Sequence, residues 1–258
     1  MIERRRKILD IVHERGFIKI TELSELLNCS EVTLRSDIRQ LDQDGLLLRT
    51  HGGAMRVEEE QTLPYNQEKL SKDADKKIEI ANTAYNLIEN GDTIIIDDAT
   101  TSFYLTHPIK ANPGKNITIV TNSLLVAMEL LGQRHVNLFM VGGQISTEMA
   151  ATMGDLAISS LEGFHVNKAF IGVHGLNFKL GITSIGSIQM QVKKSIIHSA
   201  DEVIVLADSS KFGGAYLSVI CPMEQISKVI TDQSISPEYV AVAKENNVHL
   251  IIAPKSDK

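Results

Sequence analysis

Four polar loops and one lysine in the last two-thirds of the chain have residue types that bind phosphorylated ligands. Hydroxyl side chains, free backbone amides at helix starts and lysine ammonium groups all hold a phosphate, and glycine lets the backbone approach a ligand closely. The candidate effector-binding residues are Asp97, Asp98, Ala99, Thr100, Thr101, Thr121, Asn122, Ser123, Gly142, Gly143, Lys193, Asp208, Ser209 and Lys211. Together they predict a site for an anion that also carries hydroxyl groups, such as a sugar phosphate.

Each of these features, taken singly, has an ordinary structural explanation. Ser and Thr at helix starts commonly act as caps, a Gly-Gly pair commonly makes a turn, and a single Lys commonly lies at the surface. The argument for a ligand comes from the repetition, because the carboxyl ends of parallel strands meet at one edge of a sheet. We therefore expect the loops to gather around one site.

The segments that must position these loops alternate between apolar strands and helices. Runs such as Ile94-Ile95-Ile96 and Val203-Ile204-Val205-Leu206 suit strands that are buried on both faces. Strands are expected at 93–97, 117–121, 136–141, 167–173, 203–207, 227–231 and 248–252. Helices are expected at 76–89, 101–107, 123–131, 154–161, 188–200 and 236–246. This alternation predicts an α/β fold with a mostly parallel, doubly wound sheet.

The N-terminal quarter has a different chemistry, in a helix that is expected over residues 30–42. Leu34, Ile38 and Leu41 recur at helical spacing and form a narrow apolar stripe. On the remaining surface, Arg can bind guanine edges or phosphates, and Thr and Val can contact a thymine methyl. The DNA-contacting residues predicted on this helix are Ser30, Val32, Thr33, Arg35, Ser36 and Arg39. An ordinary surface helix explains the same pattern, so the flanking segments must decide between the two.

Those flanking segments favour a winged helix-turn-helix. Residues 3–15 predict a first helix, Thr21 is expected to cap a second one, and Asn28 suits the left-handed residue that ends it. The inward residues expected on the second helix are Leu23, Leu26 and Leu27. A later short strand and glycine reversal predict a wing that contacts DNA through Arg49, His51 and Gly52. The run Arg4-Arg5-Arg6-Lys7 is expected to be a solvated face, with phosphate contact as the alternative.

Composition and charge divide the chain in the same way. It has 258 residues and a formal net charge of -6. Residues 1–56 carry ten Lys or Arg against nine Asp or Glu, and the remainder carries sixteen against twenty-three. DNA contact is therefore expected from the first part alone.

Cys29 and Cys221 lack metal-ligand spacing and are expected to be buried free thiols. The lack of a signal-like or membrane-spanning stretch leads us to expect a cytoplasmic protein.

Over nearly its full length the chain resembles a DeoR-type transcriptional regulator. The first part is similar to that family's helix-turn-helix and wing through Ser30, Thr33, Arg35, Asp37, Gly45, Arg49 and His51-Gly52-Gly53-Ala54. The second is similar to its sensor through Asp97, Thr100-Thr101, Thr121-Asn122-Ser123, Gly142-Gly143, residues 168–172 and residues 207–213. The resemblance implies a DNA-binding domain at 1–57 and a sugar-phosphate-binding and oligomerisation domain at 76–258. Residues 58–75 are expected to be a linker. The sensor fold is expected to be similar to those of ribose-phosphate isomerases and CoA transferases.

Three positions depart from the pattern of that family. Ser36 stands where relatives usually have a second adjacent arginine, so the operator preference is expected to differ. Ala99 stands where the phosphate loop usually has Gly, which narrows the room for a ligand. Gln189 lies in a stretch where many relatives have an acidic residue, and an atypical inducer or weak induction is expected.

The resemblance favours a repressor of a carbohydrate operon that a phosphorylated sugar releases from its operator. We expect a homo-oligomer, a dimer or a tetramer, to present two reading heads to double-stranded DNA. No cofactor, metal or membrane contact is expected. Activation instead of repression stays open, because the sign depends on where the operator lies. The competing hypothesis is a sugar-phosphate isomerase-like enzyme using Asp97, Lys193, Asp208 or Lys211, which leaves the N-terminal part unexplained.

Overall fold

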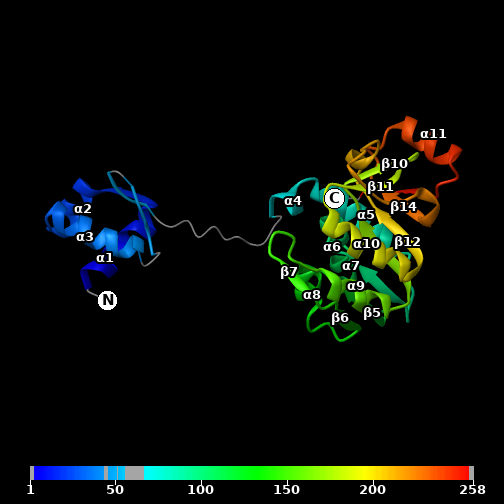
Figure 1. The fold of residues 1–258 in the computed structure, drawn as a ribbon, viewed down its shortest axis with the longest axis horizontal. Coiled ribbons are helices and arrows are strands. Elements are labelled where there is room, and N and C mark those ends of the chain that lie inside the picture. Colours follow the sequence, from blue (N-terminus) through cyan, green and yellow to red (C-terminus); the bar gives the residue numbers. More distant parts are fainter. Residues whose placement is uncertain (1–2, 44–45, 51, 56–66, 256–258) are drawn as a thin grey trace. The chain divides into compact units, whose positions relative to one another are not determined.

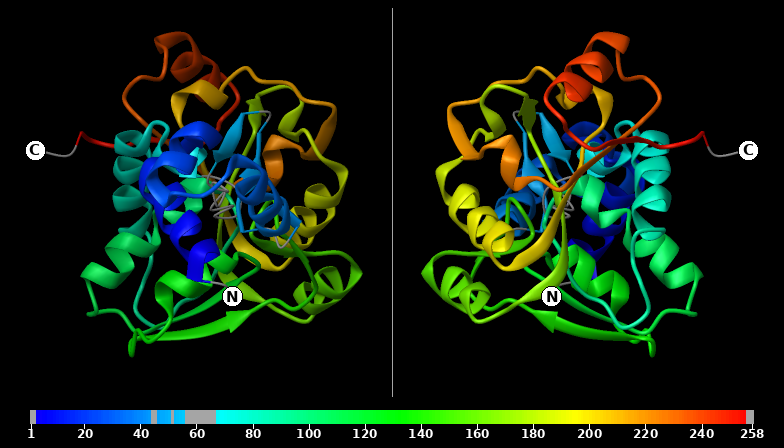
Figure 2. Two further views of the ribbon diagram at one scale, coloured as in Figure 1. Left: turned by 90° about the vertical axis from the view of Figure 1, so that its left-hand side faces the viewer. Right: turned by 90° about the vertical axis from the view of Figure 1, so that its right-hand side faces the viewer.

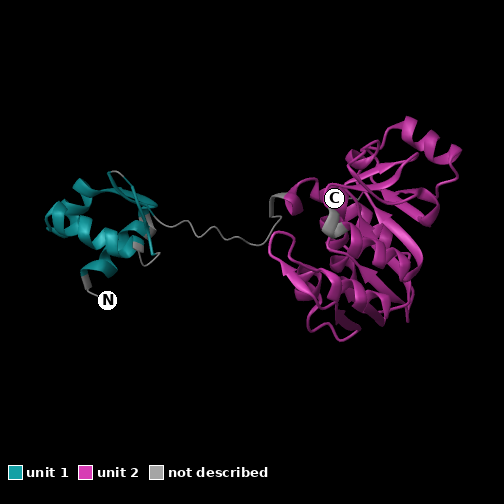
Figure 3. Ribbon diagram, viewed as in Figure 1, with its two compact units in different colours: residues 1–63 teal, residues 64–258 magenta. Residues whose placement is uncertain are grey.

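The chain folds into two units, residues 1–63 and residues 64–258 (Figure 3). The structure is a computed structural model, and it describes residues 3–43, 46–50, 52–55 and 67–255. Within the described residues, no helix is long and apolar enough to cross a membrane.

Helices and a small antiparallel sheet make up the first unit. The helices are α1 (Glu3–Arg15), α2 (Ile20–Leu27) and α3 (Glu31–Gln43), and the strands are β1 (Phe17–Lys19), β2 (Leu48–Arg49) and β3 (Gly53–Met55). The sheet order is β1-β3-β2. The apolar stripes of the helices meet in one core that includes Ile8, Val12, Leu23, Leu34 and Ile38. The predicted helix-turn-helix with a wing is therefore confirmed as a fold.

The turn between α2 and α3 forms through the residues that the sequence indicated. Asn28 adopts the left-handed conformation with φ 49°, and the hydroxyl of Ser30 accepts a hydrogen bond from the amide of Thr33 at 3.3 Å. Two details of the prediction were wrong. The second helix begins at Ile20, so Thr21 lies inside it and is not its cap. Leu26 is half exposed, because α2 has only two turns and that residue faces away from the core.

A buried carboxylate joins the first helix to the third. Asp37 is buried, and its two oxygens accept hydrogen bonds from Nε of Arg4 at 2.6 Å and from Nε of Arg5 at 2.9 Å. Burial raises the pKa of Asp37, but the two guanidinium groups outweigh burial, so the pKa lies below its usual value. The expectation of a solvated face is wrong for these two arginines, which tie α1 to α3.

The second unit contains a parallel sheet with the strand order β15-β14-β12-β9-β4-β5-β6 (Figure 1). Every adjacent pair in this sheet is parallel. In chain order the strands are β4 (Thr93–Ile96), β5 (Ile117–Thr121), β6 (Val136–Met140), β9 (Val166–Gly172), β12 (Ala200–Leu206), β14 (Lys228–Thr231) and β15 (Leu250–Ile252). Each expected strand corresponds to one of these, so the predicted doubly wound architecture is confirmed.

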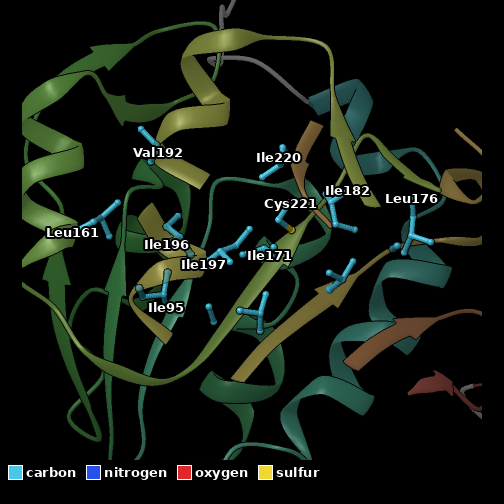
Figure 4. Packing of buried hydrophobic residues seen from close by; sticks show 14 of the residues in the cluster. Ile95, Leu161, Ile171, Leu176, Ile182, Val192, Ile196, Ile197, Ile220 and Cys221 are labelled. Atoms are coloured by element: carbon cyan, nitrogen blue, oxygen red, sulfur yellow. The ribbon is translucent and has the colours of Figure 1, made fainter. Parts of the chain in front are cut away.

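Helices cover both faces of this sheet, which explains the uninterrupted apolar runs. On one face, Ile94 and Ile96 pack in a core with α5 (Ala74–Tyr85), α7 (Thr106–Ala111) and α8 (Leu124–Leu130). On the other face, Ile95 packs with α9 (Asp155–Glu162) and α10 (Ser187–His198). Figure 4 shows Leu161, Val192 and Ile196 of these two helices around the latter core. The helices α9 and α10 lie side by side in both views of Figure 2.

Several elements are absent from the sequence prediction. A second antiparallel sheet has the order β10-β11-β13, from Gly175–Asn177, Gly181–Ser184 and Ser218–Cys221, and a hairpin joins β7 (Gln144–Ser146) to β8 (Ala151–Met153). The helix expected at 101–107 is divided into α6 (Thr100–Phe103) and α7. A short helix, α4 (Gln67–Ser71), lies in the range that is expected to be a linker. The helix expected at 236–246, in contrast, is present as α11 (Pro237–Glu245). Cys221 is buried and Cys29 is half-buried, and both are free thiols.

We predict that the carboxylate of Asp37 contributes stability to the first unit that disappears in acid. Because its folded-state pKa is depressed, this contribution is complete above the ordinary Asp value of about 3.9 and is lost as pH falls through the lower folded value. Asp37→Asn should lower the free energy of unfolding by about 1–2 kcal/mol at neutral pH. Amide exchange of α3 in the full chain measures this, and the difference from the unaltered chain should shrink below about pH 4.

Glu22→Gln is the matched control for that experiment. Glu22 pairs with Arg15 on the same unit, but both side chains are nearly half exposed. Its replacement should change stability by less than about 0.5 kcal/mol. Equal effects of the two substitutions at neutral pH would contradict the role assigned to Asp37.

Candidate functional site

A buried ion pair lies beneath the carboxyl ends of β4 and β9. Asp97, which directly follows β4, has no exposed surface, and one of its oxygens accepts a hydrogen bond from Nζ of Lys193 at 2.5 Å. The same ammonium donates to the carbonyl of Gly172 at 2.5 Å. Both carboxylate oxygens of Asp97 also accept from the amide of Gly172, at 3.1 and 3.2 Å, and one accepts from the amide of Ala99. These bonds fix the loop after β4, the end of β9 and α10 relative to one another.

Gly172 is required at this junction because of close packing. A Cβ atom built on Gly172 would lie 2.2 Å from the Cβ of Ala99, well inside van der Waals contact. The Cβ of Ala99, the position where the resemblance implies Gly, therefore faces Gly172.

Above the ion pair lies a cavity of about 250 Å³. The side chains and backbone around it come from the loop after β4, the loop after β9, α10, the loop after β12 and the segment from α4 to α5. The lining residues are Lys69, Lys72, Asp73, Lys77, Asp98, Ala99, Thr100, Thr101, Gly172, Val173, His174, Lys193, Asp208, Ser210 and Lys211. The walls thus combine ammonium groups, hydroxyls and the start of α6, which are the groups that bind a phosphate.

The cavity perturbs the ionisable groups around it. Burial lowers the pKa of Lys193, but the charges of Asp97 and Asp98 outweigh burial and raise it, so Lys193 stays charged. Burial raises the pKa of Asp98, the charge of Asp97 adds to this effect, and Lys193 opposes it. Burial, reinforced by Lys193 and Lys211, lowers the pKa of His174 to about 4. His174 is therefore neutral near pH 7, and its Nδ1 lies 3.2 Å from the hydroxyl of Ser184.

The structure gathers part of the predicted effector-binding set and separates the rest. Asp98, Ala99, Thr100, Thr101, Lys193, Asp208 and Lys211 line the cavity. Asp97 lies beneath it and is fully occupied by the contacts described above. Among the described residues, those around the cavity do not include Thr121, Asn122, Ser123, Gly142, Gly143 or Ser209.

The loop after β5 has the structural role that was the alternative explanation. Thr121 donates its hydroxyl hydrogen bond to the carbonyl of Ile96 at 2.6 Å and accepts from the amide of Ser123. The hydroxyl of Ser123 accepts from the amide of Val126 and caps α8. Asn122 reaches the cavity only indirectly, because its Nδ2 lies 3.4 Å from a carboxylate oxygen of Asp98. These residues hold the loop and do not line the cavity.

Two further predictions about the cavity are corrected by local geometry. Gly143 has φ +141°, and a Cβ there would lie 2.7 Å from the carbonyl oxygen of Met153. Gly143 therefore accommodates the close approach of β8, whereas a Cβ on Gly142 would meet nothing within 4 Å. Ser209 turns away from the cavity, because its amide and its hydroxyl donate to Asp232 at 2.6 and 3.1 Å. The side chain of Gln189 lies outside the described part of the chain.

The sequence reasoning missed the basic wall that α4 and α5 provide. Lys69 and Lys72 lie in the range that was interpreted as a linker, and Lys77 lies on a helix that was interpreted only through its apolar residues. His174 and Ser210 were also missed. The Lys-rich composition of 69–77 was a visible signal, but only the tertiary fold places that segment beside the strand-end loops.

In the first unit, the predicted reading face of α3 is accessible. Val32 is 78% exposed, and Arg35, Ser36 and Arg39 are exposed too, while Thr33 is half-buried. Arg35 donates to Glu31 at 3.2 Å in an exposed pair. Such a pair is weak in water and can be exchanged for a DNA contact. The exposed Ser36 confirms that this departure from the family pattern lies on the outer face.

The strand that leads into the wing is attached to the end of α3. The backbone amide of Arg49 donates a hydrogen bond to a carboxylate oxygen of Asp42 at 3.0 Å. The side chain of Arg49 is exposed. Gly52 is exposed, and its carbonyl accepts from the amide of Ile20 at 2.9 Å. His51 lies outside the described residues. Within those residues, no cluster of His, Cys, Asp and Glu could hold a metal ion.

Comparison with known families assigns both units. Residues 4–60 match the DeoR-like helix-turn-helix domain, and residues 72–233 match the DeoR C terminal sensor domain. The chain is also similar in part to a solved structure, ribose 5-phosphate isomerase A from Methanocaldococcus jannaschii. That likeness has a TM-score of 0.39 and 19% identity, and it covers 57% of this chain and 55% of the isomerase.

Full-length relatives agree with the family models. An uncharacterized HTH-type transcriptional regulator of Bacillus subtilis (strain 168), YulB, is 32% identical over 99% of this chain and 98% of its own length. The lactose phosphotransferase system repressor of Lactococcus lactis subsp. lactis is 33% identical over 92% of this chain and 93% of its own length. The chain belongs to the DeoR family of transcriptional regulators.

Proposed function

We propose that this protein represses a carbohydrate-utilisation operon and that a phosphorylated sugar releases it from the operator. Residues 1–57 bind DNA, residues 67–258, which include the cavity-lining lysines of the range first expected to be a linker (58–75), bind the effector and form the oligomer, and the intervening segment connects them. The observation that carries the proposal is the basic, hydroxyl-lined cavity in a chain that also has an exposed reading helix. A regulator of this kind acts where the chromosome is, so we place it in the cytoplasm.

The cavity suits a phosphate at one end and sugar hydroxyls at the other. Thr100 and Thr101 open α6 at its wall, where backbone amides and hydroxyls can hold phosphate oxygens, and Lys211 supplies a charge. Asp98 and neutral His174 offer an acceptor and an imidazole to hydroxyl groups. A cavity of about 250 Å³ has room for a small sugar phosphate. The relative from Lactococcus lactis, whose name refers to a sugar phosphotransferase system, supports this class of ligand.

The reading head suits the major groove. Val32, Arg35 and Ser36 stand on the exposed side of α3, opposite the buried stripe that anchors the helix. Arg49 stands at the wing, where it can contact the phosphate backbone. One head reads only a few base pairs, so a homo-oligomer, a dimer or a tetramer, is needed to present two heads to a palindrome or repeat.

The alternative of a sugar-phosphate isomerase is not favoured. The relatives with full-length similarity are named as transcription regulators. The two charged groups considered for proton transfer, Asp97 and Lys193, form a buried ion pair, and Asp97 has no exposed surface. Turnover of a pentose or hexose phosphate that Asp97→Asn abolishes would restore the alternative.

We predict that a phosphorylated sugar stabilises the chain through the cavity. A thermal-shift panel should include glycerol phosphate, tagatose phosphates, sugar-alcohol phosphates and inorganic phosphate. A ligand at a hundred times its dissociation constant adds about 2.7 kcal/mol to the free energy of unfolding. Lys211→Ala should weaken binding of the best panel member by about ten- to a hundredfold, because a charge-assisted contact to phosphate is lost.

Lys110→Ala is the matched control, because Lys110 is ion-paired to Glu129 and is 38% exposed, close to the 36% of Lys211. This control should bind the ligand as the unaltered chain does. Stabilisation by a phosphate-free sugar with no response to any phosphorylated sugar would contradict the proposed ligand class.

We predict that Arg35→Ala weakens operator binding by about 1–3 kcal/mol and relaxes specificity at one base pair. The operator fragment can be selected from random DNA with the purified protein, and affinity is then measured at several salt concentrations. Arg15→Ala removes an equal charge from the same unit, at a residue of α1 that pairs with Glu22 of α2. Arg15→Ala should weaken operator binding less than Arg35→Ala does, and it should leave sequence specificity unchanged. Equal affinity and specificity for Arg35→Ala and the unaltered chain would remove α3 from the interface.

A further inference from the structure

The helix α4 is held in place by hydrogen bonds to its backbone carbonyls. It has five residues, Gln67–Ser71, too few to be stable alone. The ammonium of Lys77 on α5 donates to the carbonyls of Leu70 at 3.3 Å and Lys72 at 2.7 Å, and also to that of Lys69. The hydroxyl of Tyr104, at the end of α6, donates to the carbonyl of Leu70 at 2.9 Å. Contacts from two other helices therefore define where α4 lies.

The role of Lys77 differs from that of the other lysines around the cavity. Its side chain borders the cavity, but Lys77 is 5% exposed and its three ammonium hydrogens have three carbonyl acceptors. No donor is left over for a ligand. Lys69 and Lys72 are exposed, line the cavity and belong to the segment whose carbonyls Lys77 holds.

The position of α4 in the sequence connects this arrangement to regulation. The helix begins at Gln67, immediately after the residues that join the two units. A ligand that contacts Lys69 and Lys72 from the cavity therefore acts on the segment where the chain enters the sensor.

We propose that α4 is a ligand-dependent latch and that Lys77 and Tyr104 are its positioning residues. The phosphorylated effector binds across the cavity from the start of α6 to Lys69 and Lys72 and stabilises the docked position of α4. Docked α4 fixes the end of the connecting segment and disfavours the arrangement of reading heads that fits the operator. This inference rests on the proposed function and adds the route by which the effector acts.

The latch has a definite thermodynamic form. A ligand shifts the equilibrium between docked and undocked α4 only by its difference in affinity for the two states. Lys69 on α4 and Lys72 directly after it supply that difference. A substitution that undocks α4 lowers the apparent affinity for the effector. The apparent affinity falls in proportion to the fraction of molecules in which α4 is still docked. Residues that hold α4 without touching the ligand must then change both effector affinity and operator release.

The decisive comparison is between two tyrosines. Tyr104→Phe removes one hydrogen bond to α4, at a residue that does not line the cavity. It should raise the effector concentration that releases half of the operator about fivefold, which corresponds to the loss of one net hydrogen bond. Tyr85→Phe removes a similar bond, from Tyr85 to the carbonyl of Asn112, on the opposite end of α5, and should leave release unchanged. Lys77→Met should raise the concentration tenfold or more.

Amide hydrogen exchange of residues 67–73 supplies the readout that separates a latch from general destabilisation. Saturating ligand, applied as the best member of the phosphate panel and separately as inorganic phosphate, should slow exchange in the unaltered chain and in Tyr85→Phe. The slowing should be smaller in Tyr104→Phe. Ligand that binds without changing this exchange, or Tyr104→Phe that releases operator as the unaltered chain does, would overturn the inference. Failure of every panel member to bind would instead overturn the proposed function, and with it the latch.

Discussion

The buried pair of Asp97 and Lys193 is the constraint on which the sensor depends. A carboxylate with no exposed surface must be paired and hydrogen-bonded, because desolvation otherwise makes its charge too costly. Asp97 meets that requirement by joining α10, the amide of Gly172 and the loop after β4. As a consequence, Asp98, Thr100 and Thr101 are turned toward the cavity instead of the sheet. The ion pair builds the site by position: Asp97 lies beneath the cavity, and Lys193 also lines it.

Both units contain a buried carboxylate that is paired with basic side chains and that fixes a functional surface. In the sensor, a buried carboxylate holds strand ends around a basic cavity. In the reading head, buried Asp37 accepts from Arg4 and Arg5 and holds α3 so that its arginines and small residues remain exposed. In both, a buried ion pair fixes the backbone, and other basic side chains, such as Arg35 in the head and Lys211 at the cavity, lie where the proposed DNA and effector contacts are made. This division agrees with membership of the DeoR family.

The sequence allowed the sheet to be predicted almost completely, because strands buried on both faces leave long apolar runs such as Ile94-Ile95-Ile96. The cavity was predicted only in part. Hydroxyls after β4 face the cavity and those after β5 cap α8, yet the local sequences are alike, and only the packing beyond them distinguishes the two. The same holds for α4, whose Leu70 carbonyl accepts from Tyr104, and for Arg4, which pairs with Asp37, because these partners lie 34 and 33 residues away in the chain. Partners distant in sequence leave no local pattern.

Operator and effector are expected to oppose each other through one protein. The most direct measurement is the affinity for the effector in the presence and absence of saturating operator DNA. Because coupling between two ligands is reciprocal, the operator should weaken effector binding by the same factor by which the effector weakens operator binding, about 5- to 150-fold. Equal effector affinity with and without operator would contradict the account.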